Sequence, residues 1–79
     1  MEERTVKIIV EQMKLVRTGQ ASIASWSLED VLSDIELVSG EILAESLKVR
    51  KGNKAAARRV RSYLKTLETL GLEFRKKSI

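Results

Sequence analysis

Apolar side chains recur at helical spacing in three separate stretches of the chain. In residues 54–75 they fall at alternating intervals of four and three, which keeps one stripe of a helix apolar. Residues 28–50 carry a similar stripe interrupted at Glu45, and residues 3–17 carry a shorter one. The stripes consist of Val6, Ile9, Val10, Met13 and Val16; of Leu28, Val31, Ile35, Val38, Ile42 and Val49; and of Ala56, Val60, Tyr63, Leu67, Leu70 and Phe74.

Short polar motifs mark the boundaries between these stretches. Ser27 and Asp30 have the spacing of a capping box at the start of the second helix. Gly52 suits the left-handed end of that helix, and Asn53 suits the cap of the next. A short turn between two helices with apolar stripes predicts an antiparallel helical hairpin.

The predicted fold class is therefore all-α, in a single small domain of residues 1–79. The basic helical hairpin occupies 28–79, with helices at about 28–50 and 54–75. Residues 1–27 are expected to form an N-terminal helix and a loop, although β-branched residues at its start also allow a strand there. This segment completes a three-helix bundle or pairs with a second subunit, and we expect a homodimer because so short a chain buries little surface alone.

Positive charge is concentrated in the second half of the chain. Residues 1–50 carry a net charge of −3 and residues 51–79 carry +7, within a total of +4. No acidic residue occurs between Glu45 and Glu68, whereas this interval contains eight lysines and arginines. Such segregation indicates that one part of the molecule faces a polyanion.

At 100° per residue, four of these basic residues fall within about 60° of one another, opposite the apolar stripe. They are Lys54, Arg58, Arg61 and Lys65, and they form a ridge about 16 Å long. A row of cations can simply be a solvated helix face. However, like charges four residues apart repel, and no nearby acid offsets them here. Phosphate groups would neutralise the ridge. By contrast, the acids of residues 28–50 are expected to lie on a solvated face.

Several classes of function find no support in the sequence. The chain has no cysteine and no histidine, and we expect no cofactor, no metal site, no small-molecule substrate and no enzymatic activity. No apolar run approaches the roughly 20 residues that span a bilayer, and the first residues do not resemble a secretory signal. The apolar stripe lies opposite the ridge, so membrane-surface binding is not expected either. These features favour a cytoplasmic protein.

The residues around the predicted turn resemble a known family. The string KGNKAAARRVR at 51–61, with FRKKSI at 74–79, is similar to bacterial histone-like proteins of the chlamydial linker-histone type. The resemblance covers about residues 41–79, and it implies nonspecific DNA binding in the nucleoid and chromosome condensation. It carries over Lys51, Lys54, Arg59 and Arg61 in the motif, and Arg75 and Lys76 near the end.

Charge pattern and resemblance together predict a histone-like protein that binds double-stranded DNA through its phosphates. No base-reading arrangement is evident, so we expect no sequence preference, and RNA stays open as an alternative partner. A second hypothesis is an interaction or dimerisation module, in which the acidic helix pairs with the basic one. The predicted phosphate-binding residues are Lys48, Arg50, Lys51, Lys54, Arg58, Arg59, Arg61, Lys65, Arg75 and Lys76.

Overall fold

The protein folds into three helices. The computed structural model describes residues 4–79, in which α1 spans Val6–Arg17, α2 spans Leu28–Arg50 and α3 spans Lys54–Lys77. The all-α prediction and the boundaries of α2 are confirmed, and α3 extends two residues further than expected. Residues 5–10 do not form a strand, because Thr5 accepts a hydrogen bond from the amide of Ile8 and starts a helix instead. The predicted start of this helix at residue 3 lies outside the described residues.

The predicted caps are present. The Ser27 side chain accepts from the amide of Asp30, and the Asp30 carboxylate accepts from the amide of Ser27, which completes the capping box of α2. Gly52 has φ of +88° at the turn, a conformation that favours glycine. The Asn53 side chain then accepts from Ala56 N at 3.0 Å and caps α3. The turn therefore reverses the chain within three residues.

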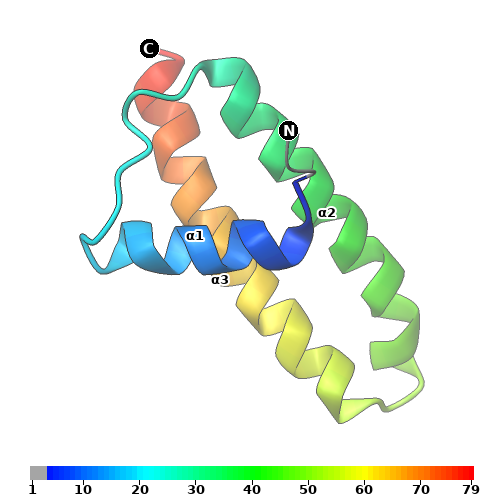
Figure 1. Cartoon of the computed structure of the whole chain (residues 1–79). Helices are drawn as coiled ribbons and strands as arrows, with labels where there is room; N and C mark the ends of the chain where they lie inside the picture. The colour runs from blue at the N-terminus through cyan, green and yellow to red at the C-terminus, as the bar shows by residue number, and fades with distance from the viewer. Residues whose placement is uncertain (1–3) are drawn as a thin grey trace.

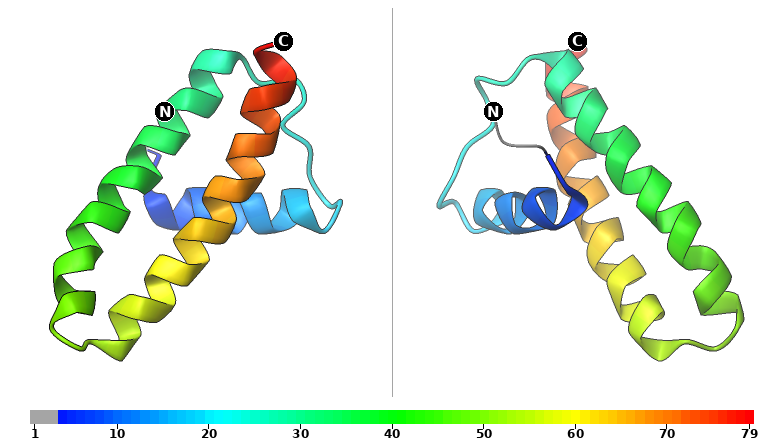
Figure 2. Two further views of the ribbon diagram at one scale, coloured as in Figure 1. Left: turned by 180° about the vertical axis from the view of Figure 1, so that it is seen from behind. Right: turned by 45° about the vertical axis from the view of Figure 1, so that its right-hand side comes forward.

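Figures 1 and 2 show α2 and α3 as an antiparallel hairpin, with α1 lying across α3. The N-terminal segment thus folds back onto the hairpin of its own chain. A loop of residues 18–27 leads from the end of α1 to the start of α2, which lies beside the C-terminal end of α3 (Figure 1). All three helices contact one another, and the longest contact is between α2 and α3.

The core lies where the three helices meet. Its fully buried members come from every helix and from the loop: Ile9, Met13, Ile23, Val31, Val38 and Leu70. The predicted stripe of α3 is confirmed throughout, because all its members are buried or half-buried. The stripe predicted for α2 holds only in its middle. Leu28 and Val49, at its two ends, are exposed. Burying each large side chain of the core stabilises the fold by about 1.5–3 kcal/mol.

A buried carboxylate fixes the chain just before α1. Asp34 on α2 is 1% exposed, and its two oxygens accept hydrogen bonds from Arg4 at 3.0 and 2.6 Å. The Arg4 guanidinium also donates to Gln12 and lies 5.0 Å from the centre of the Trp26 ring. Trp26, near the end of the loop, is half-buried and packs against the edge of the core. The acids of α2 are therefore not all solvated, and that expectation was wrong for Asp34.

Candidate nucleic-acid interface

α1 crosses α3 where α3 carries two threonines. Thr66 and Thr69 are buried, and their hydroxyls donate to the backbone carbonyls of Ser62 and Lys65. Both side chains are small and leave no polar atom unpaired, so the α1 helix can lie close to α3 here. Arg17, the last residue of α1, donates to Thr69 Oγ1 at 3.1 Å and to the carbonyl of Lys65 at 3.3 Å. These bonds hold the end of α1 on α3.

This crossing creates a basic hollow between the two helices. The hollow has a volume of about 310 Å³ and opens to solvent. Five of its six lining residues are cations, and the sixth is a serine: Lys14, Arg17, Arg58, Arg61, Ser62 and Lys65. We call this set the basic hollow. The predicted ridge of α3 forms one wall of it, and α1 supplies the other.

The α3 wall of the hollow has no internal counter-charge. Among residues 4–79, no carboxylate lies within ion-pair distance of Arg58, Arg61 or Lys65. On the α1 wall, Lys14 pairs with Glu11 at 3.3 Å, but both side chains are more than half exposed, so solvent screens the pair. Several cations facing one concave surface raise the local positive potential and attract an anion.

The next arginine along the chain has a different environment. Arg59 Nη2 lies 2.8 Å from Glu45 Oε2, and Lys48 Nζ lies 3.7 Å from the other oxygen of the same carboxylate. The Glu45 side chain is 7% exposed, so it too is not part of a solvated face. The hydrogen bond from Arg59 is the main cause that lowers the pKa of Glu45, and burial opposes it. We call these three residues the inter-helix ion cluster.

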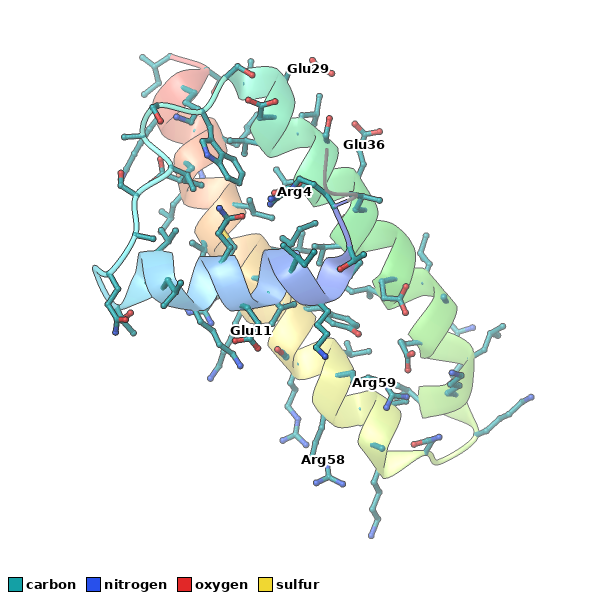
Figure 3. All side chains as sticks on the ribbon, in the orientation of Figure 1. Arg4, Glu11, Glu29, Glu36, Arg58 and Arg59 are labelled. Carbon is teal, nitrogen blue, oxygen red and sulfur yellow. The ribbon has the colours of Figure 1, made fainter. Side chains whose placement is uncertain are left out.

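Figure 3 shows the two neighbouring arginines diverging. Arg59 extends towards α2, where Glu45 receives it, and Arg58 extends away from the hairpin into solvent. Successive residues on a helix are 100° apart, so adjacent positions serve different surfaces. The ten predicted residues therefore do not share one surface.

The other predicted residues lie outside the hollow. Lys54 continues the ridge one turn before Arg58, and Arg50 and Lys51 are exposed at the α2–α3 turn. Arg75 and Lys76 are exposed in the last turn of α3, and Lys76 pairs with Glu73 at 3.5 Å. Ten residues of helix separate Lys65 from Arg75, which is about 15 Å. Lys48 and Arg59 belong to the inter-helix ion cluster.

Two residues of the hollow were not predicted from the sequence. Lys14 and Arg17 lie in the last turn of α1, in the half of the chain with net negative charge. Basic residues are common in the last turn of a helix because they interact favourably with its negative end. Their position beside α3 depends on how α1 crosses the hairpin, which the local sequence pattern does not predict.

A comparison with protein families matches residues 30–79 to the histone H1-like protein Hc1. The chain belongs to this family. No curated protein and no solved structure matches it. The Hc1 match covers nearly all of α2 and the whole of α3, including three cations of the hollow, and it leaves out α1.

Membership in the Hc1 family makes this a histone-like, DNA-binding protein of the nucleoid in general terms. The family is architectural rather than enzymatic. None of the three helices is long and apolar enough to cross a membrane. Within the described part of the chain, no group of three or more acidic residues is placed to hold a metal ion.

Proposed function

We propose that this Hc1-family chain binds duplex DNA without sequence preference, and that the basic hollow is its main phosphate-binding surface. The observation that carries the proposal is the convergence of five cations from two helices on one concave surface. Arginine can bind a phosphate through two parallel hydrogen bonds. Arg17, Arg58 and Arg61 all line the hollow, which supports this role for it. Exposed cations outside the hollow extend the contact along the duplex: Arg50, Lys51, Lys54, Arg75 and Lys76.

The alternative function, a module in which acidic α2 neutralises basic α3, finds support at a single place. The inter-helix ion cluster is such a pairing within one chain. The cations of the α3 wall take no part in it, because α2 lies against the opposite side of α3. Intramolecular pairing therefore leaves the hollow available, which favours a polyanion as its partner.

The test is a titration with fluorescent random-sequence duplex at several salt concentrations. If roughly five to seven side chains contact phosphates, log K should fall with log salt with a slope of about −4.5 to −6.3. Duplexes of different sequence should bind with the same affinity. Absence of binding by micromolar protein at roughly 50 mM salt would contradict the proposal. If the protein binds double-stranded RNA more tightly than DNA, its proposed ligand becomes RNA. Phosphate contacts alone do not distinguish the two nucleic acids.

We also propose that the protein works as a homodimer in the cytoplasm, associated with the nucleoid. Two binding surfaces joined in one particle engage DNA with higher avidity than either alone, which is what condensation of a chromosome requires. Size measurements alongside the titration test this part separately. If the protein is monomeric both free and on DNA, the homodimer proposal is wrong, and the proposal of phosphate contacts is unaffected.

A further inference from the structure

The side of α2 that faces away from α3 carries large apolar side chains in contact with solvent. Leu43 is 72% exposed and Leu47 is 61% exposed. Ala44 between them and Gly40 one turn before them are exposed as well. At 100° per residue, Gly40, Leu43 and Leu47 fall within about 60° of one another. No part of residues 4–79 covers this strip, although two adjacent exposed leucines on one helix are costly in water.

Opposite charges flank this apolar strip at its two ends. Glu36 lies at its N-terminal end and points away from α1 and α3 (Figure 3), and Arg50 lies at its C-terminal end, followed by Lys51. Glu36 and Arg50 lie 14 residues apart, which is about 21 Å of helix. One end of the strip is therefore acidic and the other is basic, with leucines between them.

We propose that a second copy of the same chain covers this strip, with the two α2 helices antiparallel. A two-fold axis near Leu43 and Ala44 then brings the acidic end of each strip to the basic end of the other. It also places Leu47 of one copy against Gly40 of the other. Gly40 leaves room for it, because nothing beyond its chain neighbours and the backbone of its own helix lies within 4 Å of the position a Cβ would occupy. A parallel pair would instead set Glu36 against Glu36 and Arg50 against Arg50.

This arrangement determines where the DNA-binding surfaces lie in the dimer. The α3 ridge is opposite the face of α3 that packs on α2, and the leucine strip is opposite the face of α2 that packs on α3. The two basic hollows therefore point outwards on opposite sides of the dimer. If the hollows bind DNA as proposed above, the dimer joins two separate duplexes rather than gripping one twice.

The strip is short, so the dimer should be weak on its own. A contact made by about 21 Å of one helix buries less than the roughly 1,200 Å² typical of stable complexes. We expect dissociation constants of about 10–100 µM in free solution. Binding to DNA raises the local concentration of the protein and favours the pair.

Disulfide crosslinking tests the position of the two-fold axis. The chain has no cysteine, so single substitutions report one site each. Ala44→Cys should give a covalent dimer under mild oxidation at about 50 µM protein, near the expected dissociation constant. Ala55→Cys, at an exposed alanine of α3 away from the strip, is the matched control and should give at least ~10-fold less dimer. Equal yields at the two sites would contradict the proposed interface.

Sedimentation equilibrium tests the leucines and the direction of the helices. Leu43→Ser/Leu47→Ser should weaken self-association at least ~10-fold. The pair Leu64→Ser/Leu72→Ser, which changes similarly exposed leucines of α3, should leave self-association unchanged. Glu36→Lys and Arg50→Glu should each weaken the dimer, and the double variant should restore it. If neither single charge reversal weakens it, the antiparallel arrangement is wrong.

Bridging is measured by whether protein on a bead-bound duplex captures a second, labelled duplex. The wild-type chain should capture it. Leu43→Ser/Leu47→Ser should bind the first duplex equally well and fail to capture the second. Loss of binding to the first duplex by the wild-type chain itself would refute the proposed function, and the sedimentation results would then decide the interface alone. Capture undiminished by the leucine substitutions would refute bridging through α2.

Discussion

Two neighbouring arginines, Arg58 and Arg59, belong to regions with opposite electrostatic character. Arg59 completes the inter-helix ion cluster, where a buried carboxylate compensates its charge. Arg58 lines the basic hollow, where five cations meet and the α3 wall has no carboxylate partner within residues 4–79. The comparison separates cations that hold the fold together from cations that are available to a ligand. A count of basic residues does not make that distinction.

The largest effect is expected from neutralising the hollow. Arg58→Gln/Arg61→Gln removes two phosphate contacts, and at roughly 50 mM salt each contact accounts for about 1.2 units of log K. Affinity for duplex DNA should fall by about 250-fold, and the salt slope should become less steep by about 1.8. Thermal stability should stay the same or rise, because the substitutions relieve repulsion between like charges one turn apart.

The matched control for this variant changes the net charge by the same amount, through substitutions at two exposed serines away from the hollow. Ser25→Asp lies in the loop and Ser33→Asp lies on α2. Together they lower the net charge by two, as the arginine substitutions do. If the control weakens DNA binding as much, net charge rather than the hollow is responsible.

A smaller loss of affinity is expected from the α1 wall. Lys14→Gln/Arg17→Gln should weaken binding by about 10-fold and reduce the salt slope by about 1. The effect is smaller because Lys14 already forms an ion pair with Glu11, and Arg17 already donates hydrogen bonds to α3. Fluorescence anisotropy at several salt concentrations provides both quantities. Unchanged affinity would confine the DNA site to α3, the helix that the Hc1 match covers.

The sequence predicted the hairpin well because its signals are local. Capping residues such as Ser27 and Asn53, the turn at Gly52 and the apolar stripe of α3 each depend on neighbours within a few positions. The spacing of 100° per residue also separated the ridge from the apolar stripe correctly. The sequence did not predict the contacts that bring distant residues together. Arg4 meets Asp34 thirty positions away, and Arg17 meets Thr69 fifty-two positions away.

The same limit explains how the predicted cations are distributed. Lys48 and Arg59 lie in a segment whose basic composition is typical of DNA binding. Only the packing of α2 on α3 reveals that Glu45 lies between them. Glu45 interrupts the apolar stripe of α2 in the sequence. In the structure it occupies a core-facing position and accepts the two cations. A lone acid in an apolar stripe opposite a basic helix can thus indicate an ion pair between the helices.

The inter-helix ion cluster should respond to substitution in the opposite way from the hollow. Arg59→Gln leaves the Glu45 carboxylate, which is 7% exposed, without its closest partner, so the melting temperature should fall by several degrees. Affinity for DNA should change about threefold at most, since this guanidinium is directed at α2. Thermal unfolding and anisotropy on the same samples measure both. A large loss of DNA affinity with unchanged melting would place Arg59 in the DNA site.

The smallest expected effect is a dependence of stability on pH that comes from the ion cluster. The pKa of Glu45 is lowered in the folded state from its ordinary value of 4.5, so its ionised form stabilises the fold. That contribution is fully present above pH 4.5 and is lost as pH falls through the lowered folded value. Wild type should therefore melt above Glu45→Gln at neutral pH. The difference should shrink as the solution is acidified below the ordinary glutamate pKa.

The Arg58→Gln/Arg61→Gln protein should keep the wild-type pH profile, because no carboxylate pairs with those arginines within residues 4–79. If wild type and Glu45→Gln lose stability in parallel on acidification, the Glu45 carboxylate does not stabilise the fold, and the contrast between the two arginines would be one of position only.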